Sequence, residues 1–139
     1  MDPSRASAFT SSATNTLRLL GQVPHAWSTP DGYPDTDAHW LSAGAMVNRW
    51  NLATNVSNGL GAPAPTHDLT RIIGTPTPTT WGGVLDAAAR SILGEPLDDA
   101  TRSAILTAFG QTASAPWPAT RSPRGLVDAV LQSPGAQLR

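Results

Sequence analysis

The chain has no cysteine, no lysine and few charged residues of either sign. Without cysteine, the sequence excludes disulfides, thiolate nucleophiles and zinc-thiolate sites, but it leaves the cellular compartment undecided. Charged residues make up 14% of the 139 positions, below the usual fraction of about 25%, so we expect a largely neutral, polar surface. All nine basic residues are arginines spread along the chain, and the net charge is −1. We therefore expect no nucleic-acid partner.

Long apolar runs are also missing, and so is a basic or apolar leader at the first residues, Met1 to Ser4. No segment approaches the roughly 20 apolar residues that span a bilayer, so we expect no membrane span. The compartment stays open: export if a signal lies upstream of this sequence, and otherwise the cytoplasm. The use of arginine alone is typical of a bacterium with GC-rich coding. The length suits one domain with a real core.

What the sequence does contain is helical periodicity interrupted by proline and glycine. Ser42, Thr80, Asp98 and Ser122 are good helix caps, and glycines follow most of the periodic segments. No segment alternates apolar and polar residues between hairpin signals, so strands are not expected. We predict an all-α fold of about five helices in an irregular bundle with long Pro/Gly-rich loops. The expected helices cover about 4–20, 43–58, 81–93, 99–109 and 123–131, with a short helix over 68–73 and a last short turn after 133.

The bulky aromatic residues and the proline/threonine segment over 75–79 suggest how these helices are organised. Trp40, Trp50 and Trp81 lie on or beside predicted helices, and we expect them in the core, because aromatic rings offer the largest apolar surfaces. We expect a single helical domain over 1–139. Its subdivisions would be about 1–59 and 79–139, joined by the proline/threonine connector.

Several particular motifs follow one another in a fixed order along the chain. They are Leu19-Leu20-Gly21-Gln22-x-Pro24, Trp27-x-x-Pro30-Asp31-Gly32-Tyr33-Pro34-Asp35, Trp40-Leu41-Ser42, Arg49-Trp50-Asn51 and, near the end, Val130-Leu131-Gln132-Ser133-Pro134. This order resembles the C-terminal part of the bacterial domain of unknown function 1800 family over nearly the whole chain. The family's full domain is several times longer and is often exported. The resemblance therefore implies the C-terminal segment of a larger helical protein, and it implies no particular chemistry.

One candidate site is a cluster of acids in the first proline-rich loop. Asp31, Asp35, Asp37 and His39 place three carboxylates and an imidazole within nine residues. These groups could hold a divalent cation or act as general acids and bases. The calcium-loop pattern fails, because Trp40 stands where that loop needs glycine. The alternative is structural: Asp31 closes a turn, and Asp35 or Asp37 caps the next one.

A second candidate site consists of loop aromatics. Trp27, Tyr33 and Trp117 lie in predicted loops, where their faces could bind glycans or peptidoglycan, or could instead lock a loop over a helix. Arg49 could bind the carbonyl groups of the first loop or the Asp31 carboxylate, either as a structural clamp or as a substrate clamp.

Common catalytic signatures are missing, including a phosphate-binding glycine loop, a nucleophile elbow and a dinucleotide fingerprint. We therefore expect an accessory or interaction domain with no catalysis by this chain alone and no cofactor beyond a possible divalent cation. Its expected partner is the remainder of its own protein or a separate protein. The alternatives are a metal-dependent or hydrolytic site at the acid cluster, and glycan binding by the loop aromatics.

Overall fold

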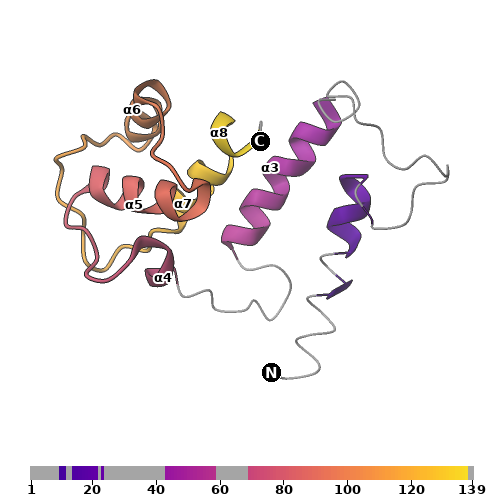
Figure 1. Cartoon of the computed structure of the whole chain (residues 1–139), viewed down its shortest axis with the longest axis horizontal. Helices are drawn as coiled ribbons and strands as arrows, with labels where there is room; N and C mark the ends of the chain where they lie inside the picture. Colours follow the sequence, from indigo (N-terminus) through magenta and orange to yellow (C-terminus); the bar gives the residue numbers. More distant parts are fainter. Residues whose placement is uncertain (1–9, 12–13, 22, 24–42, 59–68, 138–139) are drawn as a thin grey trace. The chain divides into compact units, whose positions relative to one another are not determined.

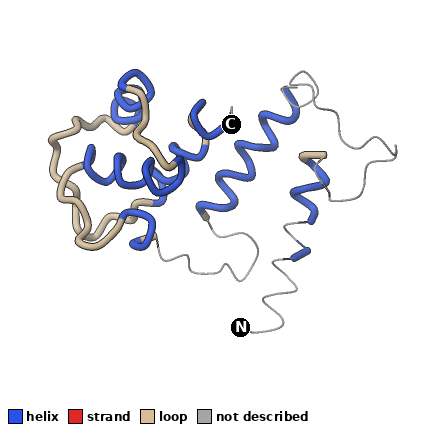
Figure 2. Tube along the Cα trace, in the orientation of Figure 1, coloured by secondary structure: helices blue, strands red, loops and turns tan. Residues whose placement is uncertain are grey.

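The computed structural model describes residues 10–11, 14–21, 23, 43–58 and 69–137. Within them the chain is helix and loop, with an isolated bridge between Thr80 and Pro116 and no strand (Figure 2). The chain divides into two compact units, Met1–Thr66 and His67–Arg139, which are described separately below. The predicted all-α class is confirmed for the described residues. No helix among them is long and apolar enough to cross a membrane.

The first unit contains α3 (Ala43–Ser57) and a helical stretch over 14–19 (Figure 1). The turn that follows the stretch contains Gly21, which has a positive φ of 68°, the backbone conformation that glycine adopts without steric cost. The side-chain amide of Asn48 on α3 donates to the Leu19 carbonyl at 2.8 Å. This bond ties α3 to the end of the preceding helical stretch.

The second unit is built around one central helix. Its elements are α4 (Thr70–Ile73), α5 (Trp81–Leu93), α6 (Asp99–Ala108), α7 (Arg124–Leu131) and α8 (Pro134–Gln137). Helix α5 contacts α4, α6 and α7, and Figure 1 shows α4 and α6 on opposite sides of it. The most deeply buried side chains come from α5 and α7: Val84, Leu85, Ala88, Ala89, Leu126 and Val130.

Local sequence signals explain where these helices begin and end. The Thr80 hydroxyl accepts the Gly83 N–H at 3.1 Å, and the Asp98 carboxylate accepts the Thr101 N–H at 2.9 Å. Both bonds satisfy a backbone donor that the first helical turn leaves without a partner. Gly94 ends α5 with a φ of 78°. The predicted span of α5 is confirmed, and those of α3, α6 and α7 are confirmed to within one residue.

Two of the three tryptophans predicted to lie in the core belong to the described residues, and one of the two is buried. Trp81 is only 2% exposed and belongs to the core, as expected. The prediction for Trp50 is wrong: the residue is 43% exposed. The buried side of α3 is centred instead on Ala53 and Ser57, and Trp50 lies at the edge of that side. Trp40 lies outside the described residues.

Candidate functional site

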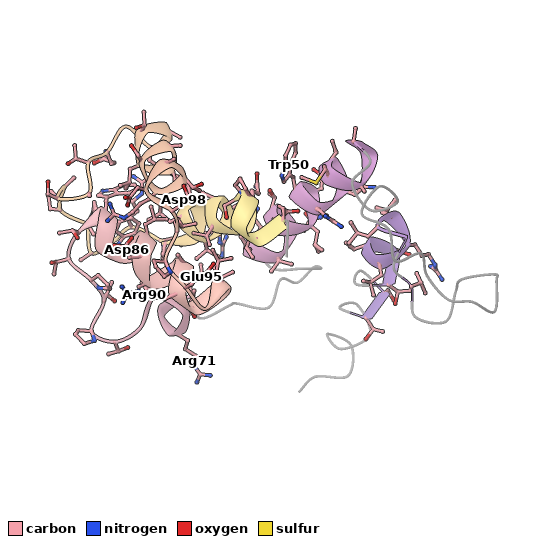
Figure 3. The ribbon with its side chains drawn as sticks, turned by 45° about the horizontal axis from the view of Figure 1, so that its top comes forward. Trp50, Arg71, Asp86, Arg90, Glu95 and Asp98 are labelled. Atoms are coloured by element: carbon pink, nitrogen blue, oxygen red, sulfur yellow. The ribbon has the colours of Figure 1, made fainter. Side chains whose placement is uncertain are left out.

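Helix α3 carries an exposed apolar face, formed by Ala43, Val47 and Trp50. These residues are spaced four and three positions apart, so they lie on one side of the helix. Val47 is 50% and Trp50 43% exposed, and Ala43 is also exposed. Figure 3 shows the Trp50 side chain standing off the ribbon of α3. Two adjacent exposed apolar side chains on one helix face make it a candidate interaction surface.

The α3 face is also free of charge. Arg49 is the sole charged residue between Ala43 and Ser57, and it is half-buried. The neighbouring exposed positions on the helix are neutral amides, Asn51 and Asn55. An uncharged face bordered by amides suits contact with an apolar protein surface, and it offers nothing that would attract a polyanion.

An aromatic cluster around Trp81 forms part of the core of the second unit. The Trp117 ring meets Trp81 edge-on, with centroids 4.7 Å apart and planes at 70°. The ring centroids of Phe109 and Trp81 are 5.6 Å apart. The Arg121 guanidinium lies over the Trp81 ring, with its carbon 4.6 Å from the ring centroid. Trp117 is half-buried and packs against the core. One ring predicted to bind glycans therefore contributes to the packing of this unit.

The N-terminal end of α5 is covered by the loop that follows α6. Two backbone N–H groups in the first turn of α5 donate to carbonyl groups of this loop. One N–H group of the loop donates to the carbonyl of Thr79, the residue before the helix cap Thr80. The bonds are Trp81 N–H to Ala115 O at 3.0 Å, Gly82 N–H to Ala113 O at 3.0 Å and Trp117 N–H to Thr79 O at 2.8 Å. A helix terminus binds phosphate through N–H groups that have no internal partner. These donors are already engaged, so the Gly82-Gly83 pair does not form an anion site.

An ion pair joins α5 to α6. Arg102 Nε donates to Asp86 Oδ1 at 2.7 Å, and Nη2 donates to Oδ2 at 3.0 Å. The hydrogen bond to Asp86 raises the pKa of the Arg102 guanidinium above its ordinary value. Gly82 leaves room for this arrangement, because a Cβ there would lie 2.6 Å from Arg102 Nη2. The pair is a clamp between two helices, and both charges are already neutralised by each other.

A shallow groove lies between α6 and the end of α7. Its volume is about 570 Å³, and its lining is mostly alanine and other small side chains. Two polar lining residues are bonded within the chain: Ser133 Oγ donates to the Val130 carbonyl at 2.7 Å, and Gln132 Nε2 donates to Asp128 Oδ1 at 2.9 Å. The residues that line the groove are Ala100, Thr101, Ala104, Ile105, Ala108, Ala129, Gln132, Ser133 and Pro134.

Most of the site residues predicted from the sequence lie outside the described residues. This applies to the proposed metal ligands Asp31, Asp35, Asp37 and His39, and to the aromatics Trp27 and Tyr33. Their roles stay predictions. Within the described ranges, no three His, Asp or Glu side chains come close enough together to hold a metal ion.

Two predicted site residues remain. Arg49 lies on α3, and Trp117 lies in the loop after α6. Sequence reasoning missed the Asp86–Arg102 pair and the position of Arg121 over Trp81. Asp86 and Arg102 are sixteen residues apart, so no helical spacing rule connects them. Arg121 belongs to an irregular loop with no periodicity to place it.

Comparison with models of known protein families identifies the family of this chain. The family model described as protein of unknown function (DUF1800) matches residues 4–138. The chain belongs to this family. No curated protein and no solved structure matches it. Membership of DUF1800 agrees with the resemblance carried by the motifs from Leu19 to Pro134, and it assigns no activity to any residue.

Proposed function

We propose that this DUF1800 chain is a helical accessory domain that binds protein through the α3 face, Ala43, Val47 and Trp50. The bound surface belongs either to the remainder of its own polypeptide or to a separate partner. The observation that carries the proposal is the exposure of Val47 and Trp50, one helical turn apart on an uncharged face.

Burial of this face would release appreciable free energy. A tryptophan side chain presents about 250 Å² at most, and Trp50 is 43% exposed. At about 25 cal/mol per Å² of apolar surface, covering the exposed part of Trp50 contributes at most about 2.7 kcal/mol. Covering Val47 adds to this. Tryptophan is also among the residues most enriched at the energetic centres of protein interfaces.

The chemistry of the face favours protein over nucleic acid or another acidic surface. Those ligands require basic side chains, and the face itself carries none. Of the rings that the sequence offered for glycan binding, Trp117 is half-buried against Trp81. An apolar protein surface needs only the aliphatic and aromatic groups that α3 presents.

A site-specific photo-crosslinking experiment tests the proposal. A photo-reactive residue replaces Val47 in the complete gene product, and the protein is irradiated in its native cells. We expect one discrete crosslinked species from position 47, identified by mass spectrometry. A crosslink within the same polypeptide identifies its own remainder as the bound surface, and a crosslink to another polypeptide identifies a separate partner.

Position 56 is the matched control, because Val56 is an exposed valine on the same helix at 39%. Nine residues separate it from Val47, about two and a half turns, so the two valines point to opposite sides. We expect crosslinking from position 47 to exceed that from position 56. Equal yields from the two positions, or no protein crosslink from position 47, would contradict the proposal. A crosslink from position 47 to polysaccharide would indicate that the α3 face binds glycans instead of protein.

A further inference from the structure

We draw no further inference here: the strongest candidate, the shallow groove of about 570 Å³ between α6 and the end of α7, is lined mostly by small apolar side chains, and nothing in the structure shows what covers it.

Discussion

Arg102 and Asp86 form a two-point ion pair, with Nε to Oδ1 at 2.7 Å and Nη2 to Oδ2 at 3.0 Å, that joins α6 to α5. Both side chains keep contact with water, with 27% of Arg102 and 36% of Asp86 exposed. Two parallel bonds fix the orientation of the guanidinium as well as its distance. Solvent screening limits the energy of such a pair, so its main effect is to set the register between the helices.

We expect a double-mutant cycle with Asp86→Asn and Arg102→Gln to give a coupling free energy of about 0.5–1 kcal/mol, the upper range for partly exposed pairs. Urea denaturation of the four proteins measures it. The coupling should fall at high salt, because the pair is partly exposed. Arg90→Gln is the control, since Arg90 is exposed on α5 four residues after Asp86. It should change the free energy of unfolding by less than about 0.5 kcal/mol. A coupling near zero at low salt would contradict this account.

Gly82→Ala should destabilise the second unit, although alanine is the better helix former. The new methyl group would lie 2.6 Å from Arg102 Nη2 and 2.9 Å from the Ala113 carbonyl oxygen. Both neighbours would have to move, at a cost of about 1–3 kcal/mol in the free energy of unfolding. Gly44→Ala is a matched control, because Gly44 is also the second residue of its helix and has nothing within 4 Å. Chemical denaturation should show no loss in the free energy of unfolding for Gly44→Ala. Equal losses for the two substitutions would refute the steric argument.

Much of the helical architecture could be predicted from the sequence, because its signals are local. Thr80 and Asp98 cap their helices through bonds to residues three positions later, and Gly94 ends α5 in a conformation that suits glycine. Such signals need no knowledge of distant contacts. The family resemblance was also accessible, since the motifs that carry it are contiguous segments of chain.

Tertiary contacts limited the prediction elsewhere. Trp50 satisfied the helical periodicity of α3, yet it is exposed, because periodicity gives a side of a helix and not the neighbour that covers it. Arg121 over Trp81 joins residues forty positions apart through an irregular loop. The acid cluster beginning at Asp31 lies outside the described residues. The sequence therefore anticipated the helices better than the candidate site.

Arg121→Ala should lower the free energy of unfolding by about 0.5–1 kcal/mol through loss of the cation–π contact with Trp81. The contact is specific, since the guanidinium carbon lies 4.6 Å from the ring centroid. Arg124→Ala is the control: it removes an exposed arginine three positions later and should be close to neutral. Denaturation followed by tryptophan fluorescence measures both variants, and a spectral change in the folded protein is expected for Arg121→Ala alone. Indistinguishable variants would show that the contact contributes nothing.

The Asp98 cap should make α6 sensitive to acid. The hydrogen bonds that Asp98 accepts from Thr101 lower the pKa of its carboxyl below the ordinary value, which is about 3.9. Because the folded-state pKa is depressed, the stabilisation is fully present above the unfolded-state pKa. It is lost as the pH falls through the lower folded-state value. The stability advantage of the wild type over Asp98→Asn should therefore shrink below about pH 4, since asparagine also caps but does not titrate.

Urea titrations at several pH values between about 2.5 and 7 measure that difference. A difference between wild type and Asp98→Asn that stays constant over the whole range would exclude the charged cap as the cause.

Trp50→Gln should cost the fold much less than the loss of a core tryptophan while removing apolar surface from the α3 face. Trp50 is 43% exposed, so only part of the residue packs against the chain, and we expect a loss of about 1–2 kcal/mol in the free energy of unfolding. Trp81→Gln is the contrasting variant, because a 2% exposed ring in the core should cost about 3–5 kcal/mol when lost. Denaturation measures both effects, and binding of an environment-sensitive apolar dye should fall for Trp50→Gln. A loss for Trp50→Gln as large as that for Trp81→Gln would place Trp50 in the core and remove the α3 face as a binding surface.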